Sequence, residues 1–216
     1  MKRLFLPVRN SQTQQRGFTV IELMIATSVF AVVLLIVTSG IIQITRVYFK
    51  GVTESTLQNT SRTIIDTISQ AVQFNGGTVV ATGNSGASRG YCIGGRRFSY
   101  LLGKQLVDGT PNATLNQTNH AFVVDDYSGC PGSAQDLSGS LMAGSRELLS
   151  PNMRLSDFSI TGLGTDRYRI TVRVVYGDDD LLNNPTTTTA ACRGIRAGSQ
   201  FCSVSELSTV VVKRVQ

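Results

Sequence analysis

Glu22 is the residue of the N-terminal region whose type and position best suit a chemical role. It stands at the edge of an apolar stretch, because residues 23–44 contain no charged side chain. A carboxylate at membrane depth costs up to about 3 kcal/mol, and less near a helix end, so it usually has a partner or a function. The alternative is that Glu22 lies among lipid headgroups without a special role.

The second set of reactive residues is four cysteines that all follow this apolar stretch: Cys92, Cys130, Cys192 and Cys202. Their spacing lacks the paired cysteines of a zinc site. If this part of the chain is exported, the cysteines are expected to form disulfides. Three connectivities are possible, and we favour Cys92 with Cys130 and Cys192 with Cys202 because each pair closes a local loop. Closing loops of these lengths stabilises a fold by roughly 4 and 3 kcal/mol.

Few other residues suggest catalysis or metal binding. His120 is the only histidine in the sequence, so a catalytic nucleophile would have a single possible base. We therefore predict that the protein is not an enzyme and needs no cofactor. Asp178, Asp179 and Asp180 offer oxygen ligands for calcium, but their spacing is not that of an EF-hand. A solvated turn is the favoured interpretation of this run, so we predict no metal site, with calcium binding as the weaker alternative.

A basic and aromatic cluster is the candidate for binding nucleic acid or another ligand. Arg89, Arg96 and Arg97 stand close in sequence to Tyr91 and Tyr100. Exposed basic groups beside aromatic rings suit single-stranded nucleic acid. The formal net charge of +6 gives this idea little support, because four of the 20 basic residues fall in the first 17 positions and none of the 14 acidic residues does. The remaining chain carries a formal +2, so a nucleic-acid partner is the less favoured alternative.

The apolar stretch is long enough to cross a membrane. Residues 23–44 would extend about 33 Å as a helix, against a hydrocarbon core of about 30 Å. A secretory signal peptide fits poorly, because its apolar segment is shorter and ends at a small-residue cleavage site. The basic residues that precede the stretch, Lys2, Arg3, Arg9 and Arg16, place the N-terminus in the cytoplasm. We predict a single-pass membrane protein whose later domain lies outside the cytoplasm.

The helix is expected to continue beyond the membrane. After Lys50 the apolar positions recur at helical spacing with polar residues between them, and Asn75 and Gly76 end the pattern. The sequence therefore predicts one helix over residues 18–74 whose second half packs an apolar stripe onto a sheet. The stripe consists of Leu57, Ile64, Ile65, Ile68 and Val72.

The rest of the chain, residues 75–216, is predicted to be a β-rich domain. Apolar and polar residues alternate over residues 168–176, and residues 207–215 form a β-branched run. Residues 98–102 and 121–124 are shorter candidates. The fold class is therefore α+β: a long N-terminal helix, first transmembrane and then amphipathic, packed on a mainly antiparallel sheet.

One segment of the N-terminal region resembles a known processing signal. The run Arg16-Gly17-Phe18-Thr19-Val20-Ile21-Glu22-Leu23-Met24 resembles the cleavage and methylation signature of type IV prepilins and type II secretion pseudopilins. In that family a short basic leader ends in glycine, the first mature residue is apolar, and the fifth is glutamate. Many type IV pilins have a proline in the second half of the membrane helix, which this chain lacks. Minor pilins often lack it too.

The resemblance implies a processing step and an assembly contact. Residues 1–17 would be a leader that a membrane aspartyl prepilin peptidase removes by cutting between Gly17 and Phe18, and the new amine of Phe18 would be methylated. Glu22 would pair with the N-terminal amine of a neighbouring subunit during assembly. The pilin-like shape, with one long helix and an extracytoplasmic domain, is also what the family implies.

A weaker similarity concerns the later part of the chain. The order of Glu147, Leu148 and Leu149, then Phe158, then the predicted C-terminal strands, is similar to that in W-type minor pilins and J-type pseudopilins. We therefore predict a minor pilin or pseudopilin, a structural and assembly subunit of a type IV pilus or type II secretion-like filament. Its partners would be other pilins, prepilin peptidase and the membrane. The alternatives are a tip-located adhesin or DNA-binding pilin module, and an anchored extracytoplasmic protein unrelated to pili.

Overall fold

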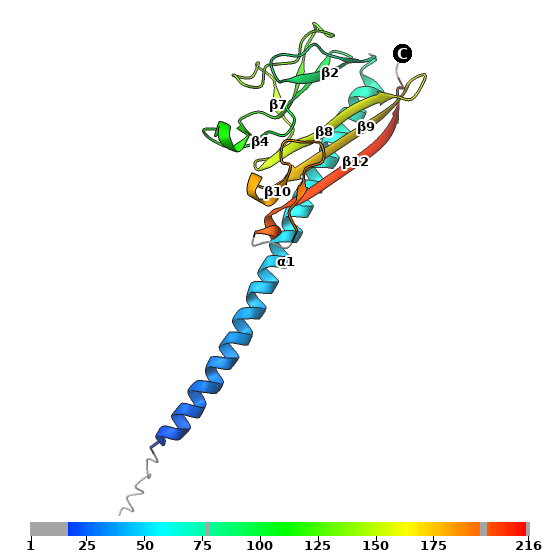
Figure 1. Ribbon diagram of the computed structural model, residues 1–216. Helices are drawn as coiled ribbons and strands as arrows, with labels where there is room; N and C mark the ends of the chain where they lie inside the picture. Colours follow the sequence, from blue (N-terminus) through cyan, green and yellow to red (C-terminus); the bar gives the residue numbers. More distant parts are fainter. Residues whose placement is uncertain (1–16, 77, 195–197, 215–216) are drawn as a thin grey trace, which may run out of the picture. The chain divides into compact units, whose positions relative to one another are not determined.

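The computed structural model describes residues 17–76, 78–194 and 198–214. The chain divides into two compact units between Thr45 and Arg46, and helix α1, Val20–Phe74, runs through this division. Figure 1 shows α1 and the labelled strands along the chain. Residues 1–16 of the predicted leader lie outside the described residues.

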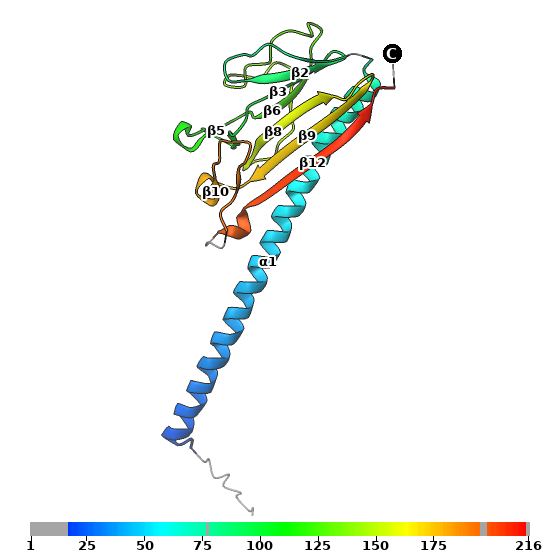
Figure 2. The same ribbon diagram turned by 45° about the vertical axis from the view of Figure 1, so that its right-hand side comes forward.

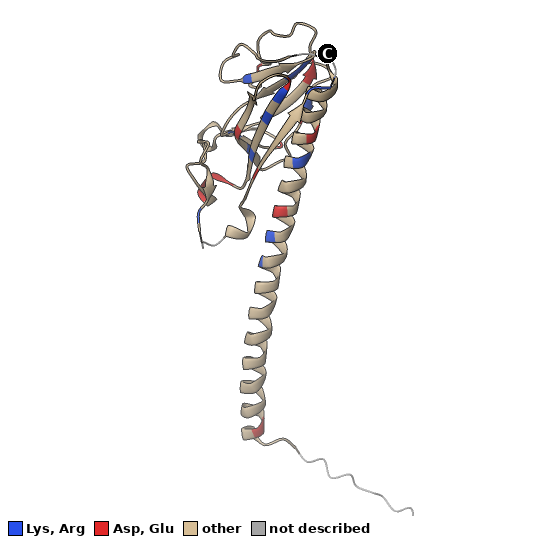
Figure 3. Ribbon diagram, turned by 90° about the vertical axis from the view of Figure 1, so that its right-hand side faces the viewer, with Lys and Arg blue, Asp and Glu red and all other residues tan. Residues whose placement is uncertain are grey.

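The part of α1 that belongs to the first unit is apolar on all sides. Between Glu22 and Arg46 it contains no charged residue, which Figure 3 shows as an unbroken tan length of helix. Two of its polar side chains bond to the helix's own backbone: the hydroxyls of Thr27 and Ser28 donate to carbonyls three residues earlier. The helix begins at Val20, two residues after the predicted position 18, because Thr19 caps it.

The part of α1 that belongs to the second unit buries one stripe. Gly51 lies within this part without interrupting the helix. At its end the backbone N–H of Asn75 donates to the carbonyl of Ala71, and Gly76 has a positive φ of 69°, a conformation that commonly ends helices. The predicted apolar stripe is confirmed and three small residues extend it; the buried residues are Thr53, Leu57, Ser61, Ile64, Ile65, Ile68, Ala71 and Val72.

The described residues of the second unit form two five-stranded sheets and a small ribbon. The first sheet is antiparallel, with the order β1 (Val79–Ala81), β2 (Arg89–Ile93), β3 (Arg96–Tyr100), β6 (Phe122–Asp126) and β7 (Arg146–Glu147). The second has the order β12 (Ser203–Val212), β9 (Arg167–Tyr176), β8 (Met153–Gly162), β4 (Gln105–Leu106) and β5 (Gln117–Thr118). Only β4 and β5 are parallel neighbours among these pairs. The ribbon pairs β10 (Leu182–Asn183) with β11 (Ala191–Cys192).

The long strands of the second sheet lie across the C-terminal half of α1, as Figures 1 and 2 show. Strand β9 matches the predicted alternation at residues 168–176 with one added residue. Strand β12 begins earlier and ends earlier than the predicted run at residues 207–215. Three short 3₁₀ turns complete the described chain: Ala113–Leu115, Asp179–Leu181 and Ser199–Phe201.

One core joins the helix and both sheets. Phe158 of β8 is at its centre, with ring centroids 4.9 Å from Phe122, 5.0 Å from Tyr100 and 5.4 Å from Tyr91. Ile68 of α1 is fully buried against the same cluster. The fold is therefore α+β, with a long apolar helix packed against mainly antiparallel sheets, as predicted.

Candidate functional site

The beginning of α1 holds Glu22 in a defined conformation. Its Oε2 atom accepts the backbone N–H of Thr19 at 2.9 Å and the Thr19 hydroxyl at 2.8 Å. In return, the backbone N–H of Glu22 donates to Thr19 Oγ1 at 3.3 Å. This reciprocal arrangement is a capping box, which satisfies N–H groups that have no partner inside the helix.

The capping box gives Glu22 a structural role in addition to any role in assembly. A carboxylate in the first turn is also favourable because the N-terminal end of a helix carries partial positive charge. The role of Thr19 was not predicted from the sequence, although threonine followed three residues later by glutamate is the capping-box pattern. The other carboxylate oxygen of Glu22, Oε1, accepts no hydrogen bond from the described residues.

The predicted cleavage position lies directly before this cap. Among the described residues, no neighbouring atom lies within 4 Å of the place where a Cβ of residue 17 would stand, and Phe18 is 90% exposed. Both residues precede the first helical residue, Val20. The backbone at this position is therefore outside the helix and open to approach.

The four cysteines form two disulfides. Cys92 is bonded to Cys130 and Cys192 to Cys202, with Cα–Cα distances of 5.7 Å and 5.8 Å. These are the two local pairs that the sequence favoured. The first joins β2 to the loop after β6, and the second joins β11 to the residue before β12.

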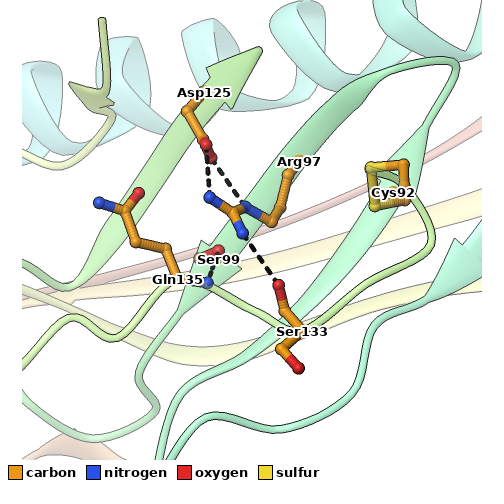
Figure 4. Close-up of a disulfide and its surroundings, with 7 residues drawn as sticks. Cys92, Arg97, Ser99, Asp125, Ser133 and Gln135 are labelled. Carbon is orange, nitrogen blue, oxygen red and sulfur yellow. Dashed lines mark hydrogen bonds and ion pairs between the residues drawn. A yellow bond between two sulfur atoms is a disulfide. The ribbon is translucent and has the colours of Figure 1, made fainter. Parts of the chain in front are cut away.

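Arg97 does not belong to an exposed patch, so the predicted basic and aromatic cluster is wrong at its central residue. Its guanidinium forms two bonds to the carboxylate of Asp125, Nη2 to Oδ2 at 2.6 Å and Nε to Oδ1 at 3.1 Å, and both side chains are nearly fully buried. Nη1 donates to the carbonyl of Ser133, and the guanidinium lies 4.0 Å from the centre of the Tyr127 ring. Figure 4 shows this network beside the disulfide of Cys92. Arg97 therefore fixes the loop that the disulfide also holds.

The remaining members of that cluster do not gather into a nucleic-acid site. Arg96 forms an ion pair with Asp126 at 3.4 Å, and Arg89 is exposed. Tyr100 is buried, and burial raises its pKa to about 12. Tyr91 packs edge-on against Phe158 in the core. Neither Tyr91 nor Tyr100 therefore offers an exposed ring on which a base could stack.

The aspartate run is used within the fold. Gln105 Nε2 donates to Asp178 Oδ1 at 2.8 Å, and Asp179 pairs at 2.6 Å with Arg154, whose side chain is fully buried. Within the part of the chain that the structure describes, no group of three or more His, Cys, Asp or Glu side chains is arranged to hold a metal ion. These contacts favour the turn interpretation over a calcium site.

Glu147 and His120 form a partly buried pair, which nothing in the sequence pattern had placed together. The carboxylate of Glu147 accepts the backbone N–H groups of Phe122 at 2.8 Å and Ala121 at 3.0 Å. Burial nevertheless raises the pKa of Glu147, and burial lowers the pKa of His120, whose Nδ1 lies 4.0 Å from Glu147 Oε2. The pair ties β7 to the beginning of β6.

The comparison with protein families identifies the N-terminal segment. The prokaryotic N-terminal methylation motif matches residues 12–38. Neither the curated proteins nor the solved structures contain a match to this chain. The motif supports the type IV prepilin-like family, whose members are pilin structural subunits, and it implies processing by prepilin peptidase.

The matched segment overlaps the one helix, among the described residues, that could cross a membrane. A window of α1 has a mean hydropathy of 2.7, and none of it is buried within the chain. Together with the methylation motif, this apolar helix fits a single-pass membrane-anchored protein.

Proposed function

We propose that this chain is a minor type IV pilin or pseudopilin, a structural and assembly subunit of a type IV pilus or type II secretion-like filament. The observation that carries the proposal is the methylation motif at residues 12–38, which overlaps the beginning of α1, a helix with no charged residue between Glu22 and Arg46. The β-rich domain lies outside the cytoplasm, and the N-terminus lies inside. The partners are other pilin subunits, which contact the N-terminal helix.

Processing at the leader is the first step of this function. Prepilin peptidase cuts between Gly17 and Phe18, residues 1–17 are removed, and the new amine of Phe18 is methylated. The position supports this step, because Gly17 is uncrowded and precedes the helix. The amine then stands four residues before Glu22, at the same end of the helix.

Glu22 serves assembly after processing. Thr19 engages Oε2, and Oε1 can receive the methylated amine of a neighbouring subunit. An ion pair there would neutralise a carboxylate that is costly in lipid when it is alone. The cap holds the carboxylate in place for that contact.

The intact mass of the protein from membranes of its native host tests the processing step. The expected mass is that of a chain beginning at Phe18 with one methyl group, and fragmentation should place that group on the terminal amine. A chain that still begins at Met1, in a host with active prepilin peptidase, would refute the proposal. Gly17→Val is the matched variant and should retain the leader.

Two substitutions of Glu22 separate capping from charge. Glu22→Gln retains the capping box, because glutamine also serves at this position, whereas Glu22→Ala removes both roles. If the charge pairs with a neighbour's amine, both variants should be cut normally yet be absent from sheared filaments. Normal incorporation of Glu22→Gln would show that capping alone matters.

A further inference from the structure

The outer edge of β12 has no partner strand within the described residues. β12 is the terminal strand of its sheet and is bonded on one side to β9. Its pairing with β9 is regular over ten residues without a bulge, and it contains no proline and one charged residue, Glu206. Long, regular edges of this kind are rare without protection, because they are ready to pair with another chain.

The hydrogen-bond pattern shows which residues face this edge. The N–H of Lys213 donates to the carbonyl of Asp166 at 2.8 Å, continuing the β12–β9 register by one residue. Antiparallel strands bond through alternate residues, so the odd-numbered residues of β12 bond to β9. The even-numbered residues point their N–H and C=O groups outward. Arg214 agrees with this assignment, because its N–H turns away from β9 and donates to Gln73.

The same even-numbered residues are accessible. Val210 is 52% exposed and Val212 is 50% exposed, and Ser208 is also exposed. Helix α1 lies behind the long strands in Figure 1, where β12 is the outermost of them. The edge therefore carries backbone groups with no partner strand among the described residues, beside exposed apolar side chains.

Positive charge accompanies the two valines. Val210 lies opposite Arg169 and Val212 lies opposite Arg167 in the ladder, and Arg214 follows on the same face. These three arginines are exposed, and none of them forms an ion pair within the described residues. Neighbouring strands lie about 4.8 Å apart, so side chains of an added strand would lie about 10 Å from those of β9. Glutamate and arginine side chains can meet across that distance.

We propose that the free edge of β12 binds an extended acidic segment of a partner polypeptide, which adds a strand to this sheet. The backbone groups of Ser208, Val210 and Val212 supply the pairing. Arg167 and Arg169 select acidic side chains on the outer face. This contact uses residues of β12 and β9 and none of the apolar first part of α1, so it does not depend on filament assembly.

Peptide binding to the full chain in detergent micelles tests this proposal. The probe is a fluorescent peptide as long as β12 that alternates glutamate with threonine. Two matched peptides accompany it, one with glutamine for glutamate and one with N-methyl groups on the amides that would face β12. We expect saturable binding of the probe, at least about tenfold weaker binding of the glutamine peptide, and loss of binding for the N-methylated peptide.

Variants of the protein provide the second arm. Val210→Pro removes one outward N–H and leaves the ladder to β9 intact, a position where edge strands tolerate proline. It should abolish binding with an unchanged far-ultraviolet dichroism spectrum and melting temperature. Arg169→Gln should weaken binding about tenfold, whereas Arg89→Gln, an exposed control on the other sheet, should not change it.

Three results would overturn the proposal. The first is that the acidic peptide shows no saturable binding. The second is that the N-methylated peptide binds as tightly as the probe, because binding would then depend on charge alone and not on backbone pairing. The third is self-association of the chain that Val210→Pro abolishes while peptide binding is absent, because a second copy would then be the occupant of the edge.

Discussion

The two halves of α1 share one helical geometry and differ in what surrounds them. Leu35, in the first half, is 72% exposed, and no residue of that half is buried within the chain. Ile68, in the second half, is fully buried under the sheet. The first half is apolar on every side, whereas the second alternates a buried stripe with charged residues such as Arg62 and Asp66.

The difference teaches that helix formation and helix burial have separate causes in this chain. A helix that is apolar all round needs an apolar environment, whereas an apolar stripe needs one packed face. The second half obtains its partner from its own sheets. The first half needs lipid or other chains, so its stability should not appear in the unfolding of the domain.

The largest expected effect comes from placing one aspartate in each half of α1 and comparing the results. Ile68→Asp should cost about 5 kcal/mol and abolish cooperative unfolding of the domain, because it buries an unpaired carboxylate. Leu35→Asp should leave urea unfolding in micelles unchanged but lower membrane integration by an amount equivalent to about 3 kcal/mol. A change in the domain's unfolding midpoint with Leu35→Asp would contradict the separation of the two halves.

The disulfides provide a second test of this difference, because both belong to the domain that packs on the second half of α1. Replacing Cys92 and Cys130 together by serine should destabilise the domain by about 4 kcal/mol, and the same change at Cys192 and Cys202 by about 3 kcal/mol. Urea unfolding followed by near-ultraviolet dichroism measures both values. The helical signal of the first half should persist in micelles when either pair is absent, and its loss would show that the halves are coupled.

The cap at the beginning of α1 predicts a smaller effect that is confined to the first half. Thr19→Ala removes the hydroxyl that donates a hydrogen bond to the Glu22 carboxylate and accepts one from the Glu22 backbone N–H. This loss should destabilise the first turn of the helix by about 1 kcal/mol. Amide exchange of the first turn should become about fivefold faster, with domain unfolding unchanged. Thr27→Ala is the control, because the Thr27 hydroxyl bonds within the helix to the carbonyl of Met24.

The smallest effect concerns pH and is expected only in the domain. Burial raises the pKa of Glu147 above its ordinary 4.5, so this residue makes the folded state less stable as pH rises from 4.5. Burial lowers the pKa of His120 below 6.5, so this residue makes the folded state less stable as pH falls below 6.5. The two slopes oppose each other in the native chain.

Single substitutions should separate the contributions of Glu147 and His120 to the pH dependence of the unfolding free energy. Between pH 4.5 and 6.5 the unfolding free energy of Glu147→Gln should rise more steeply with pH than that of the native protein. His120→Gln should show the opposite deviation. Parallel pH profiles for the native protein and both variants would contradict the assigned pKa directions.

Sequence patterns predicted the elements whose periodicity is unbroken. The stripe of α1 and the alternation of β9 follow directly from 3.6-residue and two-residue periods. Strand β8 was missed, because a register shift between Leu155 and Asp157 breaks its alternation. A bulge moves the later side chains to the other face, so the apolar residues no longer fall on every second position.

The candidate site was predictable where its chemistry is local. The residues around Gly17 and Glu22 form a contiguous signal, and Thr19 belongs to that signal although it was overlooked. Arg97 was misjudged because its partner, Asp125, stands 28 residues away in the sequence. An ion pair between residues far apart in the sequence produces no periodic pattern. The sequence alone therefore does not distinguish an exposed arginine from a buried one.

Helix α1 and strand β12 are joined near both of their ends. Lys50 donates to the carbonyl of Cys202 before the strand begins, and Arg214 donates from its backbone N–H to Gln73 after the strand ends. The two elements therefore run in the same direction, side by side. A pulling force applied to the domain at residue 46, along the helix axis, would act parallel to both elements. It would load the two hydrogen bonds and the buried stripe of α1 at the same time, in shear. The domain should therefore resist extension as a single unit and should not unzip from one end.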